Sequence, residues 1–596
     1  MRDPAPLRIA AALATLAFAV PARAQLGIDL RGGEKKPPGQ PVKPDATRKP
    51  VPLLPETKPP QKPVTMPELD VGSAGAEHGE AARRIAEANQ VFARGDDQTA
   101  ALAYDAILRD PALAEVHDQA RYQLARSLAR LGLYHSSLAW LDQILAKGAQ
   151  GSPYFKDALE WLFHVGKQTG NEALITAQVL RYAGGTFPAS EQDRYDYLLA
   201  RYSYERGLAL DEAGRSAEAR RAYDDASRLA GQVRPEAGSR PSGNGQLGDP
   251  YARARFVDGL VKYAQGQSQA AVESFKDVVR LTNPRRGRAP DSRIRELAFL
   301  QLARIHYEHK QNRYAIFYYD KMPWGGGSWL EGLWESSYAH YRIGDYEKAL
   351  GNLLTLQSPY FRDEWFPESW ILKAIIYYEN CRYPEARSIL DEFHANYEGV
   401  YRELERLTSG PAQPRAFFDA LDDAGKSRGA NTVLMRRIMK VALTDRNVKQ
   451  LDGSIVEVDR ERAALASGRT GLREAFRSSS LARDLTSGLD RERQQLADEA
   501  GARARAKLEY ERDALRELLQ QALRIKIEVA RNERAALETA LNRGGPVDVV
   551  KDYRYSVAVS DEQQYWPYDG EFWRDELGTY TYTLTKGCRD TGVRAR

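Results

Sequence analysis

Cysteine, methionine and histidine are scarce in this chain of 596 residues, which has two, five and eight of them respectively. Two cysteines cannot hold a disulfide-rich scaffold or a four-thiolate metal site. His306 and His309 could share a metal only in strained geometry, so we expect both to be ordinary packing or surface histidines. The sequence therefore predicts neither a metal nor a cofactor.

Net charge and long apolar runs are also limited. The formal net charge is only +4, whereas a nucleic-acid binder concentrates basic charge on one face. Beyond the first 24 residues, no stretch is long and apolar enough to cross a bilayer. The chain also lacks a phosphate-binding Gly-rich loop ending in Lys-Ser/Thr, a nucleophile elbow, His-Glu-x-x-His and Cys-x-x-Cys. These absences favour a binding protein over an enzyme.

The N-terminus has the pattern of a secretory signal. Arg2 and Arg8 flank an apolar run over residues 9–20, and Ala22-Arg23-Ala24 has the small residues of a cleavage site. We therefore expect residues 1–24 to be removed and the mature chain to be exported to the periplasm, free or associated with the outer membrane. Residues 25–79 are rich in Pro and Lys, and we expect a disordered linker that is either a spacer or a ligand for a groove or for acidic cell-envelope polymers.

The middle of the chain repeats one helical pattern. A small residue is followed after four positions by a large apolar residue and after three more by another apolar residue, and a turn glycine precedes each set. This spacing is the packed face of a helix. The clearest sets are Gly214 with Ala219, Tyr223 and Ala226, Gly266 with Ala271, Phe275 and Val278, and Gly344 with Ala349, Leu353 and Leu356.

These segments resemble tetratricopeptide repeats (TPRs), whose W-x2-L-G-x2-Y and A-x3-F pattern recurs about every 34 residues. The resemblance covers residues 80–400, or about eight hairpins, although Ser137 replaces the usual Ala and Cys381 the usual turn Gly. It implies an all-α, right-handed helical solenoid whose first helices line a concave groove. The whole chain also loosely resembles the exported repeat proteins of bacterial envelope complexes, including those of secretion, outer-membrane assembly and gliding motility.

The register of the repeats predicts which side chains would line that groove. Aromatic and arginine side chains are common anchors of protein interfaces. The alternative is that several of them belong to the hairpin cores. The predicted partner-binding residues are Phe256, Tyr263, Arg304, Tyr307, Trp334, Tyr338, Tyr341, Arg342 and Tyr378. The expected partners are envelope proteins.

The last third of the chain has a different character. Residues 401–545 are expected to be helical, with one long helix over about 481–541 that forms a coiled-coil hairpin, packs antiparallel on preceding helices or dimerises. Residues 546–596 alternate aromatic and polar residues as strands do, and form either a docking element or a small β-hairpin folded back on the helices. Cys381 and Cys588 either pair in an oxidising compartment or remain separate thiols.

One enzymatic alternative deserves statement. Soluble lytic transglycosylases also place a helical superhelix before their catalytic domain and use a Glu followed by Ser as general acid. Glu368-Ser369 matches that pair, but the Gly-rich and Gln-containing segments that should follow are absent. A murein-associated enzyme or regulator is therefore the alternative to a non-catalytic scaffold.

Overall fold

The computed structural model describes residues 79–169, 192–235, 250–285, 291–410, 413–426, 432–467, 471–542, 556–558, 566–567, 570–582 and 584. The expected signal and linker, residues 1–78, lie outside this part of the chain. Among the described residues, no helix combines the length and the apolar character needed to cross a membrane.

Paired antiparallel helices follow one another from the start of the described chain, as expected for an all-α solenoid. The complete hairpins are α2 (Glu80–Ala93) with α3 (Asp97–Arg109), α4 (His117–Arg130) with α5 (Tyr134–Leu145), α9 (Gln192–Glu212) with α10 (Ser216–Gln232), α11 (Pro250–Ala264) with α12 (Ser268–Leu281), α13 (Ser292–Glu308) with α14 (Asn312–Tyr319), α15 (Trp329–Arg342) with α16 (Tyr346–Leu356), and α17 (Glu368–Glu379) with α18 (Tyr383–Thr408). Helix α7 (Phe155–Thr169) begins another unit, whose continuation lies outside the described residues. Short helices η1 (Pro111–Val116), α6 (Gly148–Gly151) and η3 (Pro359–Phe361) connect some of them.

One backbone motif closes all these hairpins. The second residue after each first helix has a φ between 57° and 79°, in the left-handed region. At Gly266, for example, its N–H donates to the oxygen of Tyr263 and the next N–H donates to that of Lys262, at 2.9 and 2.8 Å, which is a Schellman motif. Lys310 and Cys381 adopt this conformation where glycine is usual, with φ of 60° and 57°. The deviation of Cys381 from the repeat pattern therefore leaves the turn unchanged.

The recurring small and aromatic residues pack the two helices of a hairpin together. Ala219 and Tyr223 are buried on α10, and the ring of Tyr223 fills the space left by Gly207 on α9. A Cβ added at Gly207 would lie only 2.4 Å from that ring. Because a side chain would separate the helices, the glycine sets their close approach.

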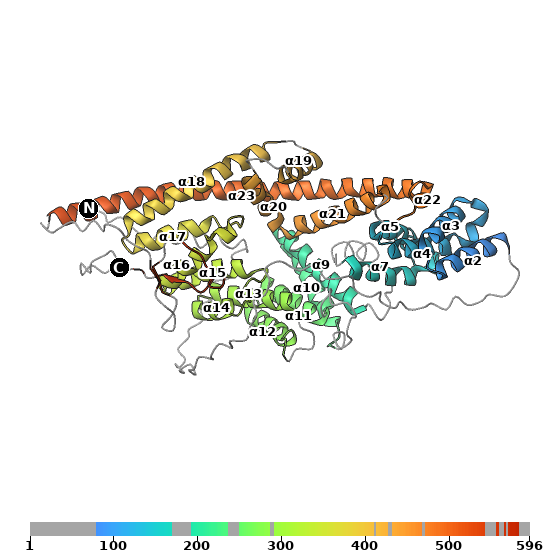
Figure 1. Cartoon of the computed structure of the whole chain (residues 1–596). Coiled ribbons are helices and arrows are strands. Elements are labelled where there is room, and N and C mark those ends of the chain that lie inside the picture. Colours follow the sequence, from blue (N-terminus) through green and yellow to red (C-terminus); the bar gives the residue numbers. More distant parts are fainter. Residues whose placement is uncertain are drawn as a thin grey trace.

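The remaining helices form a second layer across the array. They are α19 (Pro414–Lys426), α20 (Thr432–Thr444), α21 (Arg446–Ala466), α22 (Glu474–Arg477) and the 63-residue α23 (Ser480–Asn542). At 1.5 Å per residue, α23 is about 94 Å long. Figure 1 shows the hairpins following an arc while α23 runs from beside α2–α5 to beyond α17 and α18.

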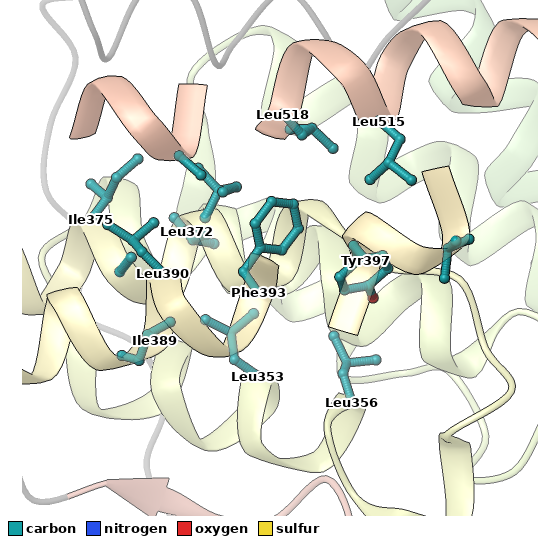
Figure 2. Close-up of a cluster of buried hydrophobic side chains, with 14 of the residues drawn as sticks. Leu353, Leu356, Leu372, Ile375, Ile389, Leu390, Phe393, Tyr397, Leu515 and Leu518 are labelled. Atoms are coloured by element: carbon teal, nitrogen blue, oxygen red, sulfur yellow. The ribbon is translucent and has the colours of Figure 1, made fainter. Parts of the chain in front are cut away.

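We call α23 the brace helix because it packs on both ends of the solenoid. Near its start, Leu481, Leu485 and Leu489 join the core of the first two hairpins. Further along, Leu515 and Leu518 join the core of the last hairpins, where they face α17 and α18 (Figure 2). Of the arrangements expected for the long helix, packing on other helices of the chain is therefore present.

A buried ionic cluster fastens α5 to this second layer. The side chain of His135 is 1% exposed, and its Nδ1 and Nε2 lie 2.7 and 3.3 Å from carboxylate oxygens of Glu492 and Glu457. Glu461 accepts from the backbone N–H groups of His135 and Ser136, at 2.6 and 3.2 Å, and so caps the N-terminus of α5. Burial opposes the charge on His135, but the glutamates raise its pKa to about 10. The imidazole is therefore protonated at neutral pH.

The tail folds back on the solenoid. Strands β1 (Ser556–Ala558), β2 (Trp566–Pro567) and β3 (Thr581–Tyr582) pair antiparallel in the order β2-β1-β3. Leu577, Tyr580 and Tyr582 are buried in the core of the last hairpins. Of the two alternatives for the tail, the described residues adopt the one that folds back on the helices.

Candidate functional site

Four tyrosines occupy the same position on consecutive first helices. Tyr263, Tyr307, Tyr341 and Tyr378 each lie three residues before the left-handed turn residue, and the carbonyl of each accepts the turn residue's N–H. All four side chains are half-buried. We call them the tyrosine row, and they run across α11, α13, α15 and α17.

Hydroxyl groups of the tyrosine row reach carboxylates of the next first helix. Tyr263 donates to Glu308 at 2.5 Å, and Tyr341 donates to Glu379 at 2.8 Å. Burial raises the pKa of both tyrosines, and the neighbouring carboxylates raise it further. Both hydroxyls therefore stay protonated and remain donors at physiological pH.

Arg304 of α13 joins this row to α15. Its guanidinium approaches both carboxylate oxygens of Glu335, with an Nη2–Oε1 distance of 2.6 Å, and also contacts Glu331. Tyr319 donates to Glu335 at 2.9 Å. Burial raises the pKa of Glu335, although Arg304 acts in the opposite direction. An arginine bound in this bidentate way fixes the register of neighbouring hairpins.

The nine predicted groove residues fall into two groups in the structure, those in hairpin cores and those on the surface of the first helices. Phe256 packs 5.3 Å from Phe275 of its own hairpin, and Tyr338 is 9% exposed within the core of the last hairpins. Both are therefore hairpin-core residues, the alternative that the sequence left open. Trp334 is half-buried against Tyr338, with ring centroids 4.8 Å apart, whereas Arg342 is exposed. Arg304, Tyr263 and Tyr341 lie at the junctions between first helices, whereas the hydroxyl of Tyr378 accepts from Asn532 of the brace helix.

Sequence reasoning missed the acidic half of this surface. Glu308, Glu331 and Glu379 are exposed, and Glu335 lies behind them with 12% of its side chain accessible. We call these four the carboxylate row. Glu308 and Glu379 recur two residues before a left-handed turn, so the register that found the tyrosines could also have found them. We call the tyrosine row, the carboxylate row, Arg304, Trp334 and Arg342 together the first-helix face.

The docked tail borders the same hairpins on their second-helix side. Trp324 donates from Nε1 to the oxygen of Leu577 at 2.9 Å, and Lys348 on α16 donates to the carbonyls of Gly578 and Tyr580 at 3.0 and 3.3 Å. The backbone of Gly351 lies directly beneath, because a Cβ there would be 1.9 Å from the Tyr580 oxygen. The tail therefore occupies α16 and leaves the first-helix face uncovered by its described residues.

The residues considered for chemistry have structural surroundings. Glu368 begins α17, and burial raises its pKa to about 7, while the hydroxyl of Ser369 donates to the oxygen of Phe366. His306 stacks between Tyr314 and Tyr318, which is a packing role. Within the described ranges, no three His, Cys, Asp or Glu side chains converge as a metal ion requires.

Cys381 is disulfide-bonded in the structure. Its proposed partner Cys588 lies outside the described residues, so the pairing of these two cysteines stays a prediction. The turn conformation of Cys381 places this bond at the C-terminal end of α17, next to Tyr378 of the tyrosine row.

Comparisons with known proteins found similarity only among solved structures. No family model matches the chain, and no curated protein matches it. Among solved structures, it is similar to the TPR domain of P58(IPK), with 12% identity over 69% of this chain and 98% of that one, and a TM-score of 0.18. It is also similar to a circular tandem repeat protein with novel repeat topology and enhanced subunit contact surfaces, with 16% identity over 78% and 97%, and a TM-score of 0.17. The geometry of its own hairpins defines this chain as a TPR-like, all-α solenoid protein.

Proposed function

We propose that this chain is a non-catalytic scaffold that binds protein partners through the first-helix face, within a complex of the bacterial cell envelope. The observation that carries the proposal is the tyrosine row, which spans four consecutive hairpins, beside the carboxylate row, which spans the last three of them. Half-buried aromatic side chains that are already held in place bind with little loss of side-chain entropy.

The chemistry of the face favours a basic partner segment. The carboxylate row carries four acidic groups, and among the predicted groove residues only Arg304 and Arg342 are basic. Arginine or lysine side chains of a partner could pair with the exposed glutamates and stack on tyrosine rings. Because hydrogen bonds and an ion pair already join successive first helices at Tyr263, Arg304 and Tyr341, the spacing between these side chains is held before a partner binds.

Export is the second part of this proposal. It is supported by the apolar run and Ala22-Arg23-Ala24 site of residues 1–24, and by the disulfide at Cys381, because structural disulfides persist mainly in oxidising compartments. N-terminal sequencing of the periplasmic protein should begin at Gln25. A periplasmic protein that retained Met1 would contradict cleavage by a signal peptidase.

The binding face can be tested by site-specific photo-crosslinking in envelope extracts. A photo-reactive residue at Tyr341 should capture a defined partner, whereas the same residue at Tyr314, which is 62% exposed on α14, should not. Glu379→Lys should then abolish the Tyr341 adduct, and the control Glu273→Lys on α12 should leave it unchanged. Equal capture at both positions, or indifference to Glu379→Lys, would contradict binding through this face.

The absence of catalysis is tested with labelled murein. The purified chain should leave the polymer intact, since Glu368 lies in the first turn of a packed repeat helix. Release of soluble fragments that Glu368→Gln abolishes would instead support the transglycosylase-like alternative.

A further inference from the structure

The brace helix carries a second apolar row that nothing in the described chain covers. Its packed row, which includes Leu518 and Val529, faces the last hairpins. The other row has members separated alternately by four and three residues. We call it the exposed seam, and it consists of Leu523, Ile527, Ala530, Arg534, Leu537 and Leu541.

The exposed seam is open to solvent over about 27 Å of helix. Leu523 and Ile527 are 51% and 54% exposed, and Leu537 and Leu541 are 42% and 67% exposed. The last turns of α23 extend beyond α17 and α18 (Figure 1). Apolar residues at this alternating spacing form the contact line of a two-stranded coiled coil, whose helices meet every 3.5 residues.

We propose that the exposed seam pairs with the same seam of a second copy of this chain, as an antiparallel coiled coil with twofold symmetry. In that register Leu523 of one copy faces Leu541 of the other, Ile527 faces Leu537, and Ala530 faces Arg534. The small alanine gives room to the only charged residue of the row. Each half of the seam thus complements the other half, as a self-associating twofold surface requires.

Charge distribution selects this direction over the parallel one. A parallel pairing would place Arg534 against Arg534 in the seam, and its flanks would bring Lys526 near Arg531 and Glu533 near Glu538. All of these are like-charge contacts. The sequence therefore disfavours the parallel pairing.

The antiparallel pairing brings unlike charges together instead. Arg524 of each copy lies beside Glu538 of the other. Two like pairs remain at the symmetry axis, Arg531 with its copy and Glu533 with its copy. Glu533 and Glu538 also have partners within their own chain, Arg387 at 3.0 Å and Arg534 at 2.7 Å, so the clearest difference between the two directions is that Arg534 meets Ala530 and not a second Arg534. Since the helix is formed and anchored before association, pairing does not require the seam to fold.

Sedimentation of the full chain over a range of concentrations tests the proposal. The wild-type chain should form a reversible dimer, and Ile527→Glu should raise its dissociation constant by about tenfold or more, because each dimer would bury two new carboxylates. Ala535→Glu, on an exposed face outside the seam, should dimerise as the wild type does. Circular dichroism melts at concentrations low enough for the wild type to be monomeric should be unchanged in both variants, because both positions are exposed.

Cysteine crosslinking then tests the direction. A mixture of Leu523→Cys and Leu541→Cys chains should yield a peptide pair linking the two new cysteines, whereas Leu523→Cys alone should not link to itself. Self-linkage at 523 would overturn the antiparallel arrangement. A wild-type chain that stays monomeric, or a dimer indifferent to Ile527→Glu, would overturn the proposal as a whole, and neither result depends on the proposed first-helix face.

Discussion

Replacing His135 with glutamine should loosen the attachment of α5 to the second layer, and only at pH values where the imidazole is charged. Glutamine retains a hydrogen-bond donor of similar length but cannot carry the positive charge that Glu457, Glu461 and Glu492 surround. The variant would therefore leave three carboxylates around a neutral side chain. Glu457 and Glu492 would lose the imidazolium with which they pair.

The size and sign of the effect follow from the pKa of His135, which burial alone would lower and the glutamates raise from 6.5 to about 10. The folded chain thus holds a proton that the unfolded chain loses. The stabilisation is fully present below about pH 6.5 and is lost as the pH rises through about 10. At about 1.36 kcal/mol per pH unit, its upper limit is about 5 kcal/mol below pH 6.5 and about 3 kcal/mol at pH 8. We expect the measured loss of unfolding free energy to be about half of these upper limits. In the variant, water can solvate the glutamates once the cluster opens, which offsets part of the lost attraction.

Urea unfolding followed by circular dichroism at pH 6, 8 and 10.5 measures this effect. The difference between wild type and His135→Gln should be largest at pH 6 and should nearly vanish at pH 10.5. Burial also lowers the pKa of Lys373 to about 8, which makes stability rise with pH in the same range, so only the difference between the two chains is informative. His309→Gln, at an exposed position, is the control. An equal difference at pH 6 and pH 10.5 would refute the reasoning.

Three further predictions concern packing and covalent structure. Gly351→Ala should release the tail, because the new Cβ would lie 1.9 Å from the carbonyl oxygen of Tyr580. Proteases should then cleave residues 570–582 faster. The control Gly399→Ala, whose Cβ would meet nothing within 4 Å, should leave the cleavage rate unchanged. Gly207→Ala should lower stability by about 1–3 kcal/mol in thermal melts through overpacking, whereas Gly231→Ala should be neutral or slightly stabilising. A non-reduced digest should contain a peptide pair joined through the two cysteines, and two separately alkylated peptides would contradict the bond.

The repeated part of the fold could be predicted because its determinants are local. The turn residue, the small residue and the large apolar residue of each hairpin lie within about a dozen positions of each other, and each has one physical role. Even the substitution of the turn glycine by Cys381 left the backbone motif intact, because the rest of the hairpin specifies the turn.

The closure of the solenoid by the brace helix could not be predicted in the same way. Its apolar residues face three different cores, and nothing in their spacing indicates which distant hairpin each one meets. The same limit applies to the candidate site. Trp334 and Tyr338 are four residues apart on one helix, yet Tyr338 is the more deeply buried because α16 and α17 cover it.

The brace helix also imposes an order on folding. Arg109 of α3 pairs with Asp484 of α23, and 375 residues separate them along the chain. Whether the chain emerges from the ribosome or across a membrane, the first hairpins emerge well before their partner helix. During that interval the apolar surface later covered by Leu472, Phe476 and Leu481 is exposed to water. We therefore expect the emerging N-terminal hairpins to bind a chaperone, and a chain truncated before α21 to aggregate although it retains all the described hairpins.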